Sequence, residues 1–209
     1  MRKIGRLSRL GKQMKRFVTV VGLVVAAVGG FFLHDLFLNT YRMHRLPKNF
    51  SVVRPGVLYR SGQIRPEHLR QVLQDHAIRT IICLNPHDEP AEEQIAEELG
   101  VKHVKFEMPG SGIGDPDLFH EYLRIIGNPE NRPALVHCAA GAYRTGVAVA
   151  LYRMHYEGWT LEDAMKEMHY SGCAIYGDQP LIDHLQKAFH SIPAEMREAV
   201  EPQVFVASN

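Results

Sequence analysis

A cysteine, an arginine and a threonine lie close together in the stretch HCAAGAYRTG, residues 137–146. The apolar run PALV precedes it and VAVALYRM follows it, which predicts a buried strand ending at Cys138 and a helix beginning near Arg144. A cysteine between a strand end and a helix N-terminus lies near backbone N–H groups that point outward and near the positive end of the helix dipole. Both favour the thiolate form of the cysteine. The same N–H groups can bind a tetrahedral oxyanion.

The side chains around this cysteine fit an anion-binding loop. Arg144 carries a planar guanidinium that can hold two phosphate oxygens at once, and Thr145 can donate its hydroxyl to the Cys138 sulfur. Small residues occupy most of the loop: Ala139, Ala140, Gly141 and Ala142, followed by Tyr143. A buried structural cysteine is the alternative interpretation, but it leaves Gly141, Arg144 and Thr145 unexplained.

This stretch resembles the HCxxGxxR[ST] motif of the cysteine-based protein tyrosine and dual-specificity phosphatases. The resemblance extends over roughly residues 51–190, includes VLYRSGQ and GWTLEDAMKEM, and points to the compact bacterial dual-specificity-like members. It implies that Cys138 is a nucleophile that forms a phosphocysteine, that Arg144 clamps the phosphate, and that Thr145 lies beside the thiolate. His137 would support the loop and the low thiol pKa.

The same resemblance assigns the remaining loop positions and a supporting element. Substrate phosphate would bind to the loop formed by Ala139, Ala140, Gly141, Ala142, Tyr143 and Arg144. The supporting element would be Arg60, Ser61 and Gln63 of YRSGQ, for which an ordinary turn at a strand end is an equally good interpretation. No cofactor is implied.

Members of this family use an aspartate as general acid, on a loop before the active-site strand. The loop EMPGSGIGDPD, residues 107–117, is in the right place. We favour Asp115, although it could also be a helix N-cap. Asp117 is the first alternative, and Asp88 and Glu107 are the others.

Strand-like and helix-like segments alternate along residues 51–195, which predicts an α/β domain with a mainly parallel central sheet flanked by helices. The predicted strands are GVLYR, RTIICLN, VKHVKF and RPALVHC. The predicted helices lie at 65–78, 89–100, 116–126, 144–158, 160–172 and 178–192.

The N-terminal part has a different character. Residues 1–16 contain seven basic side chains and no acidic one, and residues 17–33 contain no charge. With an extension to Leu38, this segment is just long enough for a transmembrane anchor at 17–38; a cleaved signal peptide is the alternative. The basic tail predicts a cytoplasmic N-terminus, and hence a periplasmic catalytic domain at an inner membrane. Residues 39–50 would be a linker and 196–209 a C-terminal tail.

Composition limits the partners and cofactors. Beyond residue 16 the chain has 17 of its 24 basic residues and all 23 acidic ones, which argues against a nucleic-acid partner. Twelve histidines form no HxxxH or HExxH pattern, so we expect no metal. Cys83 is one of three cysteines and is predicted to end a strand beside the strand of Cys138. We therefore suggest a reversible disulfide between Cys83 and Cys138 that protects Cys138 from over-oxidation.

Several functions fit these residues. A phosphatase acting on phosphotyrosine, and also on phosphoserine or phosphothreonine, fits best, with a phosphorylated protein as partner. A phosphoinositide or other small phosphoester phosphatase is a rival, although lipid-directed relatives tend to carry lysines in the loop. A rhodanese-like sulfurtransferase fits poorly around the cysteine. A non-catalytic phosphate-binding module at the membrane is the alternative from another class.

Overall fold

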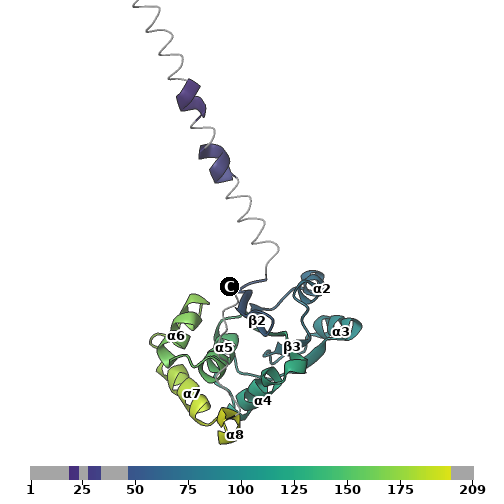
Figure 1. The fold of residues 1–209 in the computed structure, drawn as a ribbon, viewed down its shortest axis with the longest axis vertical. Helices are drawn as coiled ribbons and strands as arrows, with labels where there is room; N and C mark the ends of the chain where they lie inside the picture. Colours follow the sequence, from purple (N-terminus) through teal and green to yellow (C-terminus); the bar gives the residue numbers. More distant parts are fainter. Residues whose placement is uncertain (1–18, 24–27, 34–46, 199–209) are drawn as a thin grey trace, which may run out of the picture. The chain divides into compact units, whose positions relative to one another are not determined.

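The computed structural model describes residues 19–23, 28–33 and 47–198 (Figure 1). The chain divides into two units, Met1–Leu46 and Pro47–Asn209. The described residues of the first unit are helical. Within the described ranges, no helix combines the length and the apolar character that a membrane crossing requires. The predicted anchor at 17–38 lies partly outside these ranges, as do the basic tail, most of the linker and most of the C-terminal tail.

The second unit alternates strands and helices, as predicted. The strands are β1 (Ser51–Arg54), β2 (Leu58–Gly62), β3 (Thr80–Cys83), β4 (Lys102–Lys105) and β5 (Ala134–Cys138). The helices are α2 (Pro66–Asp75), α3 (Pro90–Leu99), α4 (Pro116–Gly127), the 3-10 turn η1 (Pro129–Asn131), α5 (Tyr143–Tyr156), α6 (Leu161–Tyr170), α7 (Gln179–His190) and α8 (Ala194–Glu198). The prediction missed β1, η1 and α8, each of which is too short to show a periodic pattern.

The five strands form one sheet in the order β1-β2-β5-β3-β4. Only β1 is antiparallel to its neighbour, so the predicted mainly parallel sheet is confirmed. β5 lies in the middle, and every one of its residues is buried. The carboxyl end of a central parallel strand is where α/β proteins generally place their sites, and in this chain it carries Cys138.

Helices cover both faces of the sheet (Figure 1). On one face, Ile81 and Leu135 pack into a cluster with residues of α2 and α3. On the other, Ile82 and Val136 pack into a larger cluster with α4, α5, α6 and α7. Helix α5 follows the Cys138 loop directly and is buried along most of its length, consistent with its apolar residues on all sides. Both the strand and the helix that flank the loop are therefore held by the core.

The folded unit begins before residue 51, where we expected the linker to end. The N–H of Gly62 donates to the carbonyl oxygen of Lys48 at 2.6 Å. The ring of Phe50 stacks on Tyr59, with 6.2 Å between the ring centroids. Residues 47–50 thus belong to the domain because they pair with the end of β2, a contact that their polar and basic composition did not reveal.

Candidate active site

Cys138 lies buried at the end of β5, at the base of the loop that leads into α5. The N–H of Gly141 donates to its sulfur at 3.2 Å. Burial alone would raise the pKa of the thiol, but the hydroxyl and N–H of Thr145, the N–H of Gly141 and the charge of Arg144 together lower the pKa below its ordinary value. The site therefore favours the nucleophilic thiolate.

Thr145 and Arg144 both lie near this sulfur. The Thr145 hydroxyl is fully buried, and the Thr145 side chain and N–H both lower the pKa of the Cys138 thiol. Arg144 Nη1 donates to the carbonyl oxygen of Leu84, just beyond β3, at 3.0 Å. This bond fixes the Arg144 side chain between α5 and the end of the sheet.

Gly141 is the one loop position where only glycine fits. Its φ is +69°, a conformation that side-chain-bearing residues rarely adopt. A Cβ atom at this position would lie 2.5 Å from the nitrogen of Gly62 and 2.7 Å from the carbonyl oxygen of Ser61. The loop therefore packs its backbone directly against the end of β2.

The predicted supporting element, Arg60, Ser61 and Gln63, does lie against the loop. Arg60 is almost fully buried, and its Nη2 donates to the Gly141 carbonyl oxygen at 2.8 Å. Desolvation lowers the pKa of its guanidinium, although nearby Glu167, Tyr122 and Cys138 oppose the shift. The N–H of Gln63 donates to the Ala139 carbonyl oxygen at 3.1 Å.

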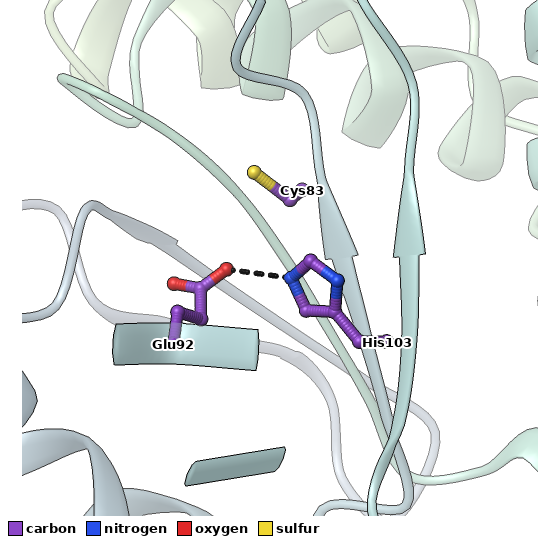
Figure 2. Close-up of side chains that lie close together, drawn as sticks. All are labelled: Cys83, Glu92 and His103. Atoms are coloured by element: carbon purple, nitrogen blue, oxygen red, sulfur yellow. Dashed lines mark hydrogen bonds and ion pairs between the residues drawn. The ribbon is translucent and has the colours of Figure 1, made fainter. Parts of the chain in front are cut away.

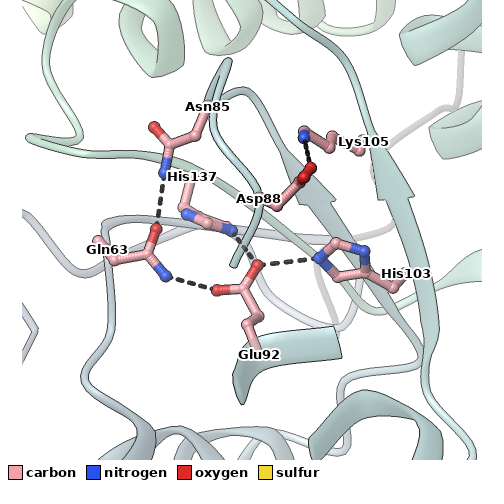
Figure 3. Close-up of polar contacts among 7 residues, drawn as sticks. All are labelled: Gln63, Asn85, Asp88, Glu92, His103, Lys105 and His137. Carbon is pink, nitrogen blue, oxygen red and sulfur yellow. Dashed lines mark hydrogen bonds and ion pairs between the residues drawn. The ribbon is translucent and has the colours of Figure 1, made fainter. Parts of the chain in front are cut away.

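His137 belongs to a buried polar network behind the loop (Figure 3). Glu92 Oε1 accepts from His137 Nε2 at 2.9 Å and from His103 Nε2 at 3.0 Å. Glu92 Oε2 accepts from Gln63 Nε2 at 2.7 Å, and Gln63 Oε1 accepts from Asn85 Nδ2 at 2.7 Å. One carboxylate thus connects α3 to residues at the carboxyl ends of β2, β3 and β5 and to His103 of β4.

The electrostatics of this network favour an ion pair. Burial alone would raise the pKa of Glu92, but hydrogen bonds from His103, His137 and Gln63 and the charge of His137 lower it to about 2. Burial alone would lower the pKa of His137, but interactions with Cys83 and Glu92 raise it above its ordinary value. His137 is therefore held as a cation directly before Cys138 in the chain.

Cys83, Glu92 and His103 could in principle share a metal ion, since their ligand atoms lie within 4.8 Å of one another (Figure 2). The Glu92 carboxylate, however, already accepts hydrogen bonds from two histidines and an amide. We therefore interpret the cluster as a hydrogen-bonded support for His137.

The hypothesis of a reversible Cys83–Cys138 disulfide stays a prediction, since the two cysteines are not joined in this structure. Cys83 pairs in register with His137, not with Cys138. Because side chains alternate between the two faces of a strand, Cys83 lies on the same side as His137, next to Glu92, whereas Cys138 belongs to the cluster on the opposite face. Both cysteines are free thiols.

The general-acid candidates are exposed: Asp88, Glu107 and Asp115 lie on two loops, and Asp117 lies in the first turn of α4. Asp115 is the N-cap of α4, and its Oδ1 accepts from the N–H of Asp117 at 3.0 Å. Asp117 pairs with His120 at 3.3 Å. Gly112 of the same loop lies against the start of α5, since a Cβ there would be 3.4 Å from the carbonyl carbon of Tyr143. The loop therefore reaches the rim of the site.

The two other candidates share one partner. Asp88 forms an ion pair with Lys105, and Glu107 lies 3.9 Å from the same ammonium group. This pairing makes them weaker candidates than Asp115 and Asp117.

Sequence reasoning missed four polar residues that support the loop: Asn49, Asn85, Glu92 and His103. Glu92 had a detectable signal, because it stands four residues before Ala96 and so lies on the inward face of an otherwise acidic helix. The other three gave no local signal, since their partners are distant in the sequence.

A profile for the tyrosine phosphatase family matches residues 46–197. This is well over half of the chain, which therefore belongs to that family. Inositol diphosphatase DSP3 of Arabidopsis thaliana is 34% identical over 128 residues, 58% of this chain and 61% of that protein. Inositol diphosphatase DSP2 of Oryza sativa subsp. japonica is 29% identical over 153 residues, 71% of this chain and 74% of that protein. The match thus spans less than two thirds of the Arabidopsis relative.

Solved structures agree with this fold. The core catalytic domain of the PP-IP phosphatase SIW14 from S. cerevisiae, in complex with citrate, has a TM-score of 0.55 and 26% identity, over 75% of this chain and 85% of that one. P. aeruginosa TpbA has a TM-score of 0.56 and 23% identity, over 73% and 91%. The second likeness concerns the fold alone.

The Glu92 network gives a prediction about stability. Replacing Glu92 by glutamine removes a buried charge opposite two histidines, and we expect a loss of about 3 kcal/mol in the free energy of unfolding at pH 6. The depressed pKa of Glu92 stabilises the fold above pH 4.5, and this contribution is lost as the pH falls toward about 2. The difference in unfolding free energy between the variant and the wild type should therefore shrink to roughly half at pH 3, as measured by urea unfolding.

The matched control is Glu93→Gln, on the same turn of α3 but exposed. It should change the unfolding free energy by no more than about 0.5 kcal/mol at either pH. Equal effects of the two substitutions would contradict the ion-pair interpretation.

Proposed function

We propose that the protein hydrolyses phosphotyrosine in phosphorylated proteins without a metal ion, through a phosphocysteine on Cys138, and that it also accepts phosphoserine or phosphothreonine. The observation that carries this proposal is the buried Cys138 thiol, whose pKa is lowered at the base of a loop that donates N–H to it. A thiolate in such a setting is a nucleophile for phosphorus.

The proposed reaction gives each group one role. The Cys138 thiolate attacks phosphorus, the bond from phosphorus to the tyrosyl oxygen breaks, and Asp115 gives its proton to that oxygen. Asp115 then takes a proton from water, which attacks phosphorus and breaks the S–P bond, releasing inorganic phosphate and regenerating the thiolate. Arg144 and the loop N–H groups bind the phosphoryl oxygens throughout.

The loop side chains favour a singly phosphorylated group. Ala139, Ala140 and Ala142 add no positive charge beside Arg144. Lys105, at the end of the edge strand β4, forms an ion pair with Asp88. A substrate with many phosphates needs several cationic partners, and this loop supplies few.

Inositol pyrophosphate is the second candidate substrate. It is supported by the names of the relatives, several of which are inositol diphosphatases. The shared loop chemistry would serve either substrate, so turnover decides between them.

Turnover measurements test the nucleophile and the substrate together. The full chain should hydrolyse p-nitrophenyl phosphate and a phosphotyrosyl peptide in the presence of EDTA, with kcat/KM for the peptide exceeding that for an inositol pyrophosphate. Cys138→Ser should lose at least about 10⁴-fold in kcat, because the attacking atom is gone.

Cys173→Ser is the matched control and should retain activity, because Cys173 is a free cysteine of the hydrophobic core. Activity retained in Cys138→Ser would refute the nucleophile. Preference for the inositol pyrophosphate would favour the second candidate, and phosphate binding without turnover would indicate a binding module.

The general acid is tested by paired substitutions. We expect Asp115→Asn to lower kcat for a phosphotyrosyl peptide by about 10²- to 10⁴-fold, the usual contribution of a general acid. Asp117→Asn should change kcat much less. The reverse ranking would assign the acid to Asp117, and unchanged rates in both variants would contradict an acid on this loop.

We also propose that residues 17–38 anchor the protein in the inner membrane, with its N-terminus in the cytoplasm and the catalytic domain in the periplasm. The uncharged run and the basic residues before it support this. Full-length protein should stay in the membrane pellet after a carbonate wash. The double substitution Val24→Arg and Val25→Arg should release it, since each central arginine costs about 3 kcal/mol of insertion free energy. Wild-type protein in the supernatant would contradict the anchor.

A further inference from the structure

Three consecutive carbonyl groups of the loop are hydrogen-bonded from outside the loop. The Ala139 oxygen accepts from the N–H of Gln63 at 3.1 Å. The Ala140 oxygen accepts from Asn49 Nδ2 at 2.8 Å. The Gly141 oxygen accepts from Arg60 Nη2 at 2.8 Å. Each donor thus fixes the orientation of one peptide plane.

A trans peptide is planar, so its N–H points away from its C=O. Holding the Ala139, Ala140 and Gly141 oxygens outward therefore turns the N–H groups of Ala140, Gly141 and Ala142 the opposite way. The middle peptide shows the result directly, because the Gly141 N–H donates to Cys138 Sγ at 3.2 Å. The peptide that Asn49 holds is thus the one that hydrogen-bonds the nucleophile.

The chemistry of an asparagine suits this position. Its Nδ2 donates a second hydrogen bond, at 3.1 Å, to the carbonyl oxygen of Ser171, the C-cap of α6. A carboxylate of the same shape has no N–H to donate. The φ of Asn49 is +54°, a conformation that asparagine adopts more readily than most residues. One side chain therefore ties the end of α6 to the loop.

We propose that Asn49 is a positioning residue for the phosphatase reaction. By holding the Ala140 carbonyl, it aims the Gly141 N–H at Cys138 and so stabilises the thiolate. The inference rests on the proposed function only in taking Cys138 as the nucleophile, and it can be tested without turnover.

The test is the pH dependence of Cys138 alkylation by iodoacetamide, followed by mass spectrometry of the peptide that contains Cys138. Asn49→Asp keeps the side-chain shape but loses both donors, and Asn49→Gly tolerates the positive φ. We expect both variants of the full chain to be alkylated about fivefold more slowly than the wild type at pH 6, since a hydrogen bond to a charged group is lost. The midpoint of the rate profile should move to higher pH, and kcat should fall more than KM rises.

Asn131→Asp is the matched control. Asn131 Nδ2 also donates to a backbone carbonyl, that of Ile125 at 2.9 Å, but at the end of α4. We expect Asn131→Asp to lower the melting temperature about as much as the Asn49 substitutions do. The pH profile of Cys138 alkylation should not shift in this variant.

The outcomes separate the two proposals. One outcome is that the wild type is alkylated at low pH and both Asn49 variants keep the same pH profile. That result would overturn the role of Asn49 and leave the proposed function standing. A wild-type profile typical of an ordinary thiol would contradict the proposed function and, with it, this inference.

Discussion

The hydrogen bond from the Gly141 N–H to the Cys138 sulfur is the interaction on which the site depends. A peptide left to itself in a turn can face either way, and a carbonyl directed at the sulfur would repel both the thiolate and a phosphate. The chain prevents this by holding the loop carbonyls from outside, with donors from the end of β2 and from the residues before β1. The glycine itself is required because its neighbours leave no space for a Cβ atom.

Because these polar contacts are buried, breaking one of them costs free energy, and the contacts therefore hold the loop in place. Arg60, Glu92 and His137 are charged groups in the interior, where an unpaired charge would be strongly unfavourable. Their partners come from different strand ends, so the ion pair and the guanidinium bond also fix how β2, β5 and α3 meet beneath the loop. The same groups that stabilise the fold locally thus set the electrostatic environment of the Cys138 thiol.

Much of this could be predicted from the sequence because the signals are local. The run before Cys138 and the apolar residues after Arg144 are contiguous, so the strand, the loop and the helix follow from periodicity and from the positions of small residues. The supports are different. Asn49 lies 91 positions from Ala140, and Glu92 lies 45 from His137, so only the folded topology brings them together. The position of Cys83 is a related case: its strand was correctly predicted to lie beside that of Cys138, but the register, which pairs Cys83 with His137, could not be predicted.

The most direct test of the account is the isolation of the covalent intermediate. Full-length wild-type protein is mixed with ³²P-labelled phosphotyrosyl peptide, quenched with detergent at alkaline pH within milliseconds, and digested. Label is expected on the peptide that contains Cys138, in an S–P linkage, and none is expected in Cys138→Ser. Label on any other residue, or turnover without a labelled enzyme under single-turnover conditions, would contradict it.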